Sequence, residues 1–276
     1  MSIIQCGRFR LDLSQPQVMA IINLTDDSFT GDGLHGDLSA ALRRAELAVA
    51  QGAHMLDIGA ESSRPGADPV PDEQELERVV GFIERTRSWN VPLSVDTLKP
   101  SVMKAAVEAG ADMINDINAF RAPGAIEACS KSDLGLCVMH MQGEPRTMQD
   151  DPRYVDVVAE VKAFLDERVA ALQAAGVARE RIVLDPGFGF GKRTAHNFAL
   201  LRELERFRVD GLAVLAGLSR KSMLGAVTGR AVEDRMPASV AAALIAVQHG
   251  AGIVRVHDVG PTCDALKVWQ AVCAAG

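Results

Sequence analysis

The chain has 276 residues, of which 48% are hydrophobic and 24% are charged, and its formal net charge is −7. This length and composition supply enough apolar surface for a continuous core, which excludes extensive disorder and fits one (β/α) barrel. The acidic balance opposes diffuse binding to nucleic acid or to a membrane surface, so any anion site must be local.

The N-terminal segment lacks a basic stretch followed by a long apolar run and a small-residue cleavage site, so we expect a cytoplasmic protein. Two short apolar runs, Ile3–Cys6 and Phe9–Leu13, flank Gly7. They predict a β-hairpin that plugs one end of a barrel. The longest run of small and apolar residues, Ala238–Val247, is about half of the roughly 20 residues that a membrane-spanning helix needs.

After the hairpin, short runs rich in Val, Ile and Leu alternate with longer segments of helical periodicity, the pattern of a parallel sheet with crossover helices. The helical segments include Ser39–Gln51, Asp72–Arg87 and Tyr154–Ala175, and glycine often marks their ends. Eight runs are predicted strands: Val18–Ile22, His54–Ile58, Pro92–Val95, Asp112–Asn115, Gly135–Met139, Arg181–Leu184, Ala213–Ala216 and Ile253–Val256.

We therefore predict a single (β/α)8 TIM barrel with an N-terminal β-hairpin, forming one α/β domain over residues 1–276. No linker or low-complexity tract interrupts it. The cysteines form no Cys-x-x-Cys pair, and we expect core residues rather than disulfides or zinc ligands. They are Cys6, Cys129, Cys137, Cys263 and Cys273.

Polar residues follow nearly every predicted strand at its C-terminal end. In a barrel of parallel strands these ends converge on one rim, where the βα loops build the active site. The alternative, that such residues cap helices or form turns, remains open for two or three of them. The polar residues are Asn23, Asp57, Asp96, Asn115, Asp116, His140, Asp185, Arg255 and His257.

Several chemistry-bearing motifs are absent or incomplete. The segment from Asp185 to Lys192 is glycine-rich, but Pro186 and Arg193 break the P-loop spacing and Lys192 breaks the dinucleotide-binding pattern. Its glycines instead let a loop approach a flat ligand closely. His-Glu-x-x-His and Gly-x-Ser-x-Gly are both missing, which argues against a catalytic zinc and a nucleophilic serine.

Segments spread over most of the chain together resemble the dihydropteroate synthase family of pterin-binding barrels. Their order and their placement at successive strand ends make the set specific. The family usually has Pro where this chain has Asp26 and Thr where it has Ser63. The matching segments are Ile22–Phe29, Asp57–Gly66, Ser94–Thr97, Ile114–Ile117, Met139–Met141, Asp185–Lys192, Gly217–Ser222 and Arg255–Asp258.

The resemblance implies a transferase of folate biosynthesis that joins a dihydropterin, carried as its hydroxymethyl diphosphate, to para-aminobenzoate and releases diphosphate. A dihydropterin presents a flat edge of alternating donors and acceptors, which Asp96, Asn115 and Asp185 can match. Burying a carboxylate costs free energy unless it is hydrogen-bonded. A ligand with several N–H groups would supply those hydrogen bonds. Asp116 points the other way along its strand, and we expect a structural role for it.

The diphosphate requires cations. Arg255 and His257 lie two residues apart and share a strand face, so both can reach one anion. A salt bridge for Arg255 and core packing for His257 are the alternatives. Asn23, on the neighbouring strand, is placed to contact the phosphate or a Mg²⁺ ion on it, because Mg²⁺ keeps phosphate oxygens and waters as ligands. Diphosphate release is the difficult step, so we expect electrostatic catalysis by Asp96, Lys221, Arg255 and His257.

Further contacts follow from the resemblance and from residue chemistry. Lys221 and Ser222 open a predicted helix beside the slot, where Lys221 would polarise the pterin and Ser222 would meet the benzoate carboxylate. Arg220 could pair with a surface carboxylate instead. Met139 would form one wall of the pterin slot. The remaining predicted contacts are Ser63 with the pterin, Arg64 with diphosphate, and Phe29, Arg64, Pro65 and Phe190 with para-aminobenzoate.

Two other functions are possible from sequence. A methyl-pterin transferase to a cobalt corrinoid would keep the pterin slot but leave Arg255 and His257 without a purpose. A non-catalytic partner or regulatory subunit would be favoured if the anion site were missing. The apolar helices Glu233–His249 and Pro261–Ala274 fit a dimer face or core packing, and the resemblance predicts a homodimer.

Overall fold

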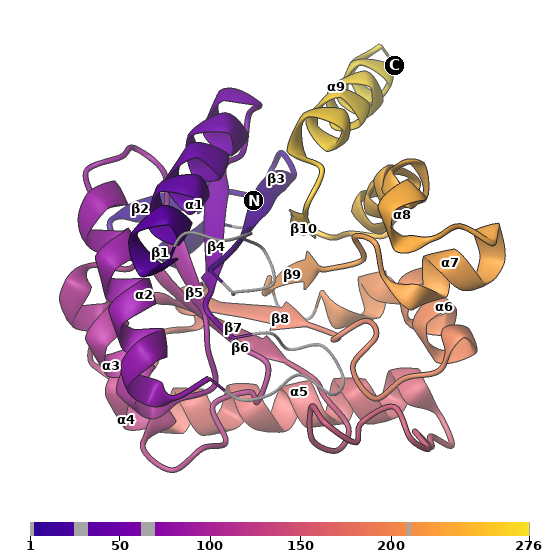
Figure 1. The fold of residues 1–276 in the computed structure, drawn as a ribbon. Coiled ribbons are helices and arrows are strands. Elements are labelled where there is room, and N and C mark those ends of the chain that lie inside the picture. The colour runs from indigo at the N-terminus through magenta and orange to yellow at the C-terminus, as the bar shows by residue number, and fades with distance from the viewer. Residues whose placement is uncertain (1–2, 25–32, 62–69, 209–210, 276) are drawn as a thin grey trace.

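The structure, a computed structural model, describes residues 3–24, 33–61, 70–208 and 211–275, and of residues 33–37 only the backbone. Within these ranges eight parallel strands close into a barrel in the order β10-β3-β4-β5-β6-β7-β8-β9 (Figure 1). The strands are β3 (Gln17–Asn23), β4 (Met55–Gly59), β5 (Leu93–Asp96), β6 (Met113–Asp116), β7 (Gly135–Met139), β8 (Ile182–Asp185), β9 (Ala213–Ala216) and β10 (Ile253–Val256).

Helices alternate with the strands and surround the barrel (Figure 1). Short 3₁₀ turns at Arg179–Arg181, Leu204–Phe207 and Val232–Asp234 complete the connections. The helices are α1 (Gly33–Ala50), α2 (Asp72–Thr86), α3 (Pro100–Ala109), α4 (Ala125–Ser130), α5 (Val157–Ala174), α6 (Thr194–Arg202), α7 (Ser222–Thr228), α8 (Met236–Gln248) and α9 (Val259–Ala274).

The predicted barrel is confirmed, and every predicted strand agrees with the structure to within one residue at each end. The helix prediction that began at Ser39 was too short, because α1 starts at Gly33 and the glycines at 33 and 36 hide its first turns in the sequence. Asp156 caps α5 by accepting hydrogen bonds from the amides of Val158 and Ala159, each 3.0 Å long.

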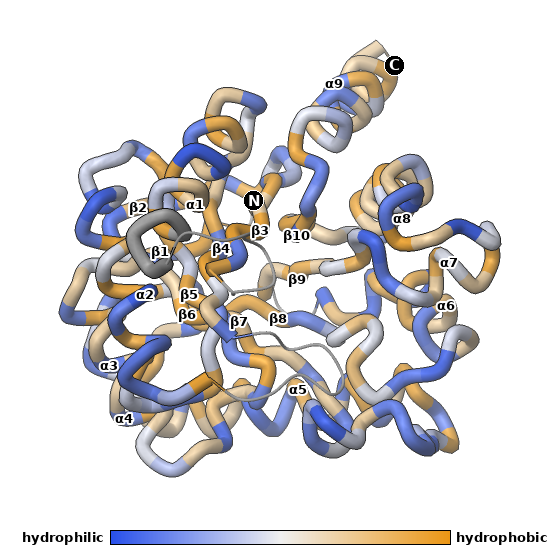
Figure 2. Tube along the Cα trace, in the orientation of Figure 1, coloured by the Kyte–Doolittle hydropathy of each residue, from blue (hydrophilic) through white to orange (hydrophobic). Residues whose placement is uncertain are grey.

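The sheet separates two apolar cores. Outward-facing strand residues such as Ile58, Val95 and Leu136 pack against the surrounding helices. Inside the barrel, buried residues including Met19 and Met55 fill the end at which the strands begin. Figure 2 shows hydrophobic strands at the centre and many hydrophilic segments around the periphery. Among the described residues no helix combines the length and apolar content needed to cross a bilayer.

The predicted hairpin is present and closes the end of the barrel at which the strands begin. Its strands, β1 (Ile3–Cys6) and β2 (Phe9–Asp12), pair antiparallel. Ile4 and Cys6 are buried against the interior core. Arg8 donates to both carboxylate oxygens of Asp112, which directly precedes β6. With this end closed, a ligand can enter the interior only from the opposite rim, where the strands end.

Candidate active site

On β4, β6, β8 and β10 the barrel interior changes from apolar to polar within two residues. Successive side chains of a strand point to opposite faces, so residues two positions beyond the interior core also point inward. Met55 is followed in this way by Asp57, and Met113 by Asn115. This upper polar layer, a name kept below, consists of Asp57, Ser94, Asp96, Asn115, Asp185 and Arg255.

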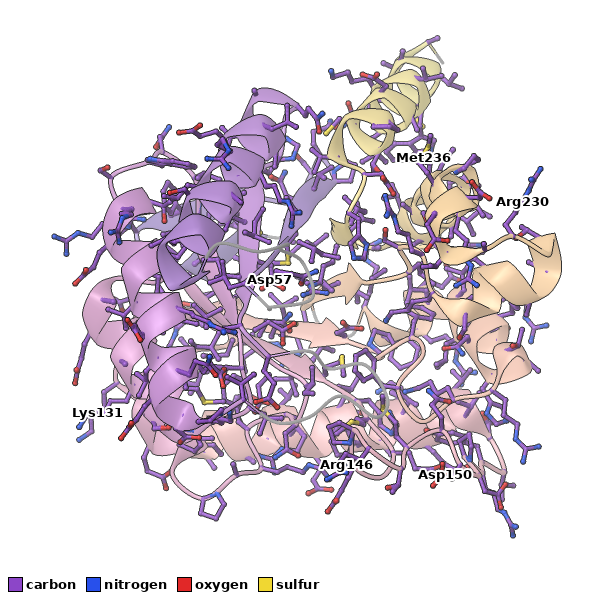
Figure 3. All side chains as sticks on the ribbon, viewed as in Figure 1. Asp57, Lys131, Arg146, Asp150, Arg230 and Met236 are labelled. Carbon is purple, nitrogen blue, oxygen red and sulfur yellow. The ribbon has the colours of Figure 1, made fainter. Side chains whose placement is uncertain are left out.

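Arg255 joins two carboxylates of the upper polar layer. Its Nε lies 2.5 Å from Oδ2 of Asp57, and its Nη2 lies 2.8 Å from Oδ2 of Asp96. Burial alone would lower the pKa of Arg255, but the two carboxylates outweigh it and raise that pKa above its ordinary value. Figure 3 shows Asp57 at the centre of the barrel, far from peripheral residues such as Lys131 and Arg230. The guanidinium is therefore fixed at the centre of the layer.

The upper polar layer contains buried polar atoms that the described residues do not satisfy. Asn115 donates from Nδ2 to Oδ2 of Asp57 over 3.3 Å. Oδ1 of Asp57, Oδ1 of Asn115 and the hydroxyl of Ser94 have no hydrogen-bond partner among the described residues. Leaving a buried polar group unpaired costs about 1–3 kcal/mol. The layer is thus suited to a ligand or water that brings N–H or O–H donors.

Two carboxylates of the layer, Asp96 and Asp185, have raised pKa values. Burial, reinforced by the charges of Asp57, Asp116 and Glu75 and opposed by Arg255, raises the pKa of Asp96 to about 7. Burial also raises the pKa of Asp185, although its Oδ1 accepts a 2.7 Å hydrogen bond from the amide of Gly187. Groups with strongly shifted pKa values often mark functional sites.

Lys221 reaches the same interior from the loop after β9. A Cβ placed on Gly217 would lie 3.9 Å from both Nζ of Lys221 and Cβ of Arg255, so the two cations flank this glycine. The ammonium donates to the carbonyl of Phe188 and lies 4.7 Å from the ring centroid of Phe190. Burial lowers the pKa of Lys221 to about 8, opposed by Asp185 and Asp96. At pH 7 Lys221 therefore remains mainly protonated.

An apolar cluster lies beside the polar groups at the rim. Its buried members are Ile117, Met139, Met141 and Met148, and Leu98 and Phe190 pack against them. Met139 ends β7, and its neighbour in the register is Asp185. A flat ligand that presents polar edges to the carboxylates can place a ring face on this cluster.

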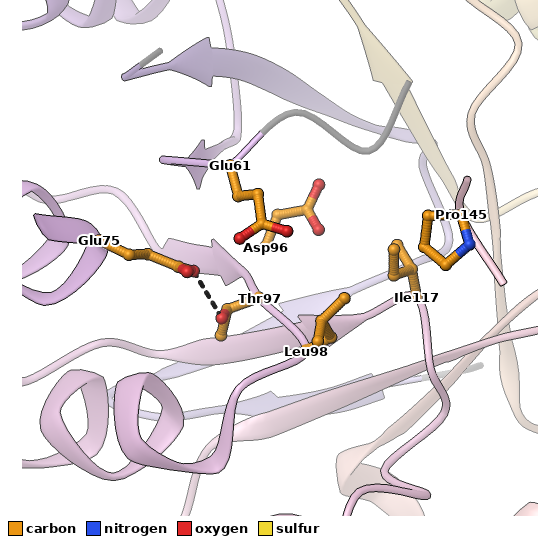
Figure 4. Close-up of a pocket in the computed structure, with 7 residues that line it drawn as sticks. All are labelled: Glu61, Glu75, Asp96, Thr97, Leu98, Ile117 and Pro145. Atoms are coloured by element: carbon orange, nitrogen blue, oxygen red, sulfur yellow. Dashed lines mark hydrogen bonds between the residues drawn. The ribbon is translucent and has the colours of Figure 1, made fainter. Parts of the chain in front are cut away.

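A pocket opens at the rim next to Asp96 (Figure 4). One side is acidic, formed by Glu61, Glu75 and Asp96, whereas the other is apolar, formed by Leu98, Ile117 and Pro145. Thr97 also lines it and donates to Glu75 over 2.7 Å. The pocket therefore continues the pairing of carboxylates with an apolar wall from the interior to the surface.

The glycine-rich loop after β8 is fitted against the backbone of the β7–α5 connection. A Cβ on Gly187 would lie 1.9 Å from the carbonyl oxygen of His140, and one on Gly191 would lie 2.4 Å from that of Gln142. Both glycines have positive φ angles. The prediction that the glycines admit a flat ligand was incomplete, because these two admit another stretch of backbone.

Other strand-end residues are structural. Asp116 faces outward, as predicted, and accepts from the amides of Asn118 and Phe120 at 2.7 and 2.6 Å. His140 is buried, and the ammonium of Lys192 lies 2.9 Å from its Nδ1. Burial and Lys192 lower the pKa of His140 to about 2, so it is neutral.

Two of the predicted diphosphate contacts, Asn23 and His257, lie at the ends of their strands. Asn23 ends β3, and the register connects it through Gly59 to Asp96. His257 directly follows β10, is exposed, and has Nδ1 2.9 Å from the hydroxyl of Ser219. Arg255 is paired with Asp57 and Asp96 in this structure, which is the salt-bridge alternative.

Of the remaining predicted contacts, the structure describes some and leaves others outside the described residues. Ser222 is exposed and is the first residue of α7. Arg220 pairs with Asp258 at 2.5 Å, which confirms that it can bind a surface carboxylate. Predictions for Phe29, Ser63, Arg64 and Pro65, and the departure at Asp26, fall outside the described residues.

Sequence reasoning missed the role of Asp57. It was recognised as a strand-end residue, but it was assigned no contact. Its signal was available, because Asp57 lies two residues beyond Met55 and so shares the inward face of β4. The pairing of Asp57 with Arg255 could not be predicted from the sequence, because 198 positions separate the two residues.

Comparisons with known proteins agree with this geometry. The model of the family described as pterin binding enzyme matches residues 19–257. The dihydropteroate synthase of Haemophilus influenzae is 50% identical over 266 residues, covering 96% of this chain and 97% of that protein. Two solved structures are also similar: Burkholderia cenocepacia dihydropteroate synthase with 7,8-dihydropteroate (55% identity, TM-score 0.92, 99% and 97% coverage) and Xanthomonas albilineans dihydropteroate synthase with 4-aminobenzoic acid (50%, 0.93, 99% and 99%).

Proposed function

Because this chain belongs to the family of pterin-binding enzymes, we propose the upper polar layer as the site where it acts as a dihydropteroate synthase. The enzyme joins 6-hydroxymethyl-7,8-dihydropterin diphosphate to para-aminobenzoate, releasing diphosphate, in folate biosynthesis. The C–O bond between the pterin methylene and the diphosphate breaks, and its electron pair leaves with the diphosphate oxygen. The amine nitrogen of para-aminobenzoate bonds to the methylene and loses a proton.

The observation that carries the site assignment is the shortage of donors in the upper polar layer. Oδ1 of Asp57 and Oδ1 of Asn115 are buried acceptors without partners among the described residues. A dihydropterin brings an amino group and ring N–H groups on a flat edge. Asp96, Asn115 and Asp185 would accept from that edge, and Met139 would contact a ring face.

The cations of the site would assist departure of the leaving group. Arg255 is held at the centre by Asp57 and Asp96, and Lys221 lies across Gly217 from it. Preorganised charges of this kind stabilise a developing anion without having to reorient during the reaction. His257 would donate to diphosphate oxygens at the rim. Asp96 would stabilise positive charge on the pterin methylene as the C–O bond breaks.

Asn23 would hold Mg²⁺ on the diphosphate. Within the described ranges, no group of three or more His, Cys, Asp or Glu side chains is arranged to hold a metal ion. Mg²⁺ keeps phosphate oxygens and waters among its ligands, so Asn23 would add one amide oxygen to an ion carried mainly by the substrate. The ion would neutralise charge on the departing diphosphate.

The second substrate would bind at the outer side of the pterin. Phe190 lies beside Lys221, where it can contact the aromatic ring, and Ser222 begins α7 with an exposed hydroxyl. Phe29, Arg64 and Pro65 are the other proposed contacts for para-aminobenzoate, Ser63 for the pterin, and Arg64 also for diphosphate. An arylamine is uncharged near neutral pH, so no general base is required of these residues.

We further propose that the enzyme is a cytoplasmic homodimer. Apolar side chains are exposed on three successive helices at one side of the barrel: Val227 of α7, Met236 and Ile245 of α8, and Val268 and Val272 of α9. A second copy could cover them. Light scattering should give twice the mass of the chain, and Ile245→Glu should shift it towards the monomer. A monomeric wild-type protein at micromolar concentration would contradict the dimer.

The function is tested by mixing the purified protein with the pterin diphosphate, para-aminobenzoate and Mg²⁺. We expect equimolar diphosphate and 7,8-dihydropteroate, no dihydropteroate without para-aminobenzoate, and loss of turnover on chelation. Pterin binding without diphosphate release would contradict the transferase and leave a binding protein or a corrinoid methyltransferase.

A further inference from the structure

The glycine-rich loop after β8 adjoins both proposed substrate sites. It begins directly after Asp185, which ends β8, and it contains Phe190. Residues 186–193 belong to no helix or strand. Buried carbonyls in such a segment lack the regular partners of a helix or sheet and must be paired in another way.

Side chains supply those partners. Every backbone carbonyl from Gly187 to Lys192 accepts a hydrogen bond from a side chain. Nζ of Lys192 donates to the carbonyls of Gly187 and Phe190, each over 2.9 Å. Asn197 of α6 donates to the carbonyl of Lys192 over 3.3 Å. The other donors are Lys221 to Phe188, Gln149 to Gly189, and Tyr154 to Gly191.

The nitrogen of Lys192 also joins this loop to the neighbouring one. It lies 2.9 Å from Nδ1 and 3.2 Å from the carbonyl oxygen of His140, which directly follows β7. Lys192 is 3% exposed. Burial lowers its pKa, opposed by the charge of Asp185, yet both protonation states of the side chain keep N–H donors. Three carbonyl oxygens and one ring nitrogen therefore converge on a single buried donor.

The close fit of the two loops makes this donor necessary. A Cβ on Gly187 would lie 1.9 Å from the carbonyl oxygen of His140, so the two backbones are in contact there. Without the N–H groups of Lys192, the buried carbonyls of His140, Gly187 and Phe190 would each lose a donor. The loop would then have to move away from His140 to admit water.

Such a movement would displace the ring of Phe190. Lys192 holds the carbonyl of this residue, and its ring packs on the apolar cluster that contains Met139 and Met141. The ring centroid lies 4.7 Å from Nζ of Lys221. Because carbonyl and ring belong to one residue, the contact at Lys192 sets where the ring stands relative to Lys221.

We propose that Lys192 is a positioning residue for para-aminobenzoate, because its buried nitrogen ties the loop after β8 to His140 and so fixes Phe190 beside Lys221. The inference rests on the proposed function, which assigns Phe190 to the second substrate. Lys192 itself touches no reacting atom. Its loss should weaken use of the second substrate more than binding of the first, since Asp96 and Asn115 lie on strands outside the loop.

The test compares Lys192→Met with a matched control, Lys131→Met, which removes an exposed lysine at the periphery (Figure 3). Methionine keeps a long, flexible apolar side chain but has no N–H donor. For Lys192→Met we expect the KM for para-aminobenzoate to rise about tenfold, while the Kd for 6-hydroxymethylpterin changes less than threefold. Lys131→Met should behave as the wild type.

A second readout does not depend on turnover. The amide of Phe190 donates to the carbonyl of Gly187 over 3.1 Å, and that carbonyl is one of those held by Lys192. The Phe190 amide should therefore exchange with deuterium at least tenfold faster in Lys192→Met than in the wild type. If Lys192→Met does not fold, Lys192→Gln serves instead. Its amide nitrogen ends one atom short of the lysine nitrogen, so the KM should rise about threefold and the same exchange should be faster.

Three results would each overturn the inference. They are an unchanged KM for para-aminobenzoate, a KM and a pterin Kd that rise equally, and an unchanged exchange rate at Phe190. A lower kcat with an unchanged KM belongs to the first of these, because it would mean that Lys192 supports only the fold. A wild type that forms no dihydropteroate would overturn the proposed function instead, and exchange at Phe190 would still show whether Lys192 holds the loop.

Discussion

The two ends of the barrel hold equally buried carboxylates, Asp112 and Asp57, that differ in how many of their oxygens are hydrogen-bonded. At the end closed by the hairpin, Asp112 accepts from the amide, Nε and Nη2 of Arg8 and from the amide of Leu93, so both oxygens are satisfied. At the open end, Asp57 shares one oxygen between Arg255 and Asn115 and leaves the other without a partner among the described residues.

This difference separates stability from function. A buried charge with a full set of partners supports the fold, whereas one short of partners weakens it and is retained for a ligand. The strands that place Met55 and Met113 at the closed end place Asp57 and Asn115 two residues further on. Substitutions at the two ends should therefore have opposite effects on stability and activity.

The largest effect is expected from Asp112→Ala. The variant loses charge-assisted hydrogen bonds and leaves the buried amide of Leu93 without its acceptor, so the free energy of unfolding should fall by roughly 3 kcal/mol. The folded fraction should keep the wild-type Kd for 6-hydroxymethylpterin. Urea denaturation and calorimetric titration measure the two quantities. A normal unfolding free energy would remove the contrast between the ends.

Asp96→Asn should have the reverse effect. We expect kcat to fall about 100-fold, equivalent to about 2.7 kcal/mol of transition-state stabilisation, because the amide cannot stabilise positive charge on the methylene. Pterin affinity should change less than threefold, and the melting temperature should not fall. Steady-state kinetics and calorimetry test this. Turnover near the wild-type value would exclude the role given to Asp96.

Asp57→Asn tests the comparison of the two barrel ends at Asp57, whose contact with Arg255 the sequence did not predict. Loss of the charge should let Arg255 shift towards Asp96, and we expect the KM for the pterin diphosphate to rise about tenfold, or about 1.4 kcal/mol. The unfolding free energy should stay the same or rise. Asp166→Asn, an exposed position on α5, is the control. A large loss of stability would show that Asp57 resembles Asp112.

The smallest effect concerns pH. The pKa of Asp96 is about 7 in the native protein and near 3.9 in an unfolded chain, so between these values the native state binds more protons. Its contribution therefore favours folding at low pH and is lost as the pH rises through 7. Relative to Asp96→Asn, the ligand-free wild type should lose about 1.3 kcal/mol between pH 5 and 6. A pH-independent difference would reject the raised pKa.

The sequence predicted the barrel well because the strand signals are local. Runs such as Gly135–Met139 and Ala213–Ala216 have the predicted bounds, since a buried parallel strand reads as a continuous apolar run. The start of α1 was missed because glycines disguise a helix whose stability comes from packing.

The sequence predicted which residues form the site, but it did not predict which of their side chains bond to each other. Strand-end position identified Asp96, Asn115, Asp185 and Arg255, because parallel strands end on one rim. The bonds from Arg255 to Asp57 and from Arg255 to Asp96 depend on side-chain directions across the barrel, which periodicity does not encode. The roles of these residues towards substrate stay predictions.

The most direct test is a crystal structure of the protein with 6-hydroxymethylpterin. The account predicts the ring at the open end, with its N–H groups within hydrogen-bond distance of the side chains of Asp96, Asn115 and Asp185 and a face against Met139. A pterin bound elsewhere, with those three side chains making no contact to it, would contradict the account.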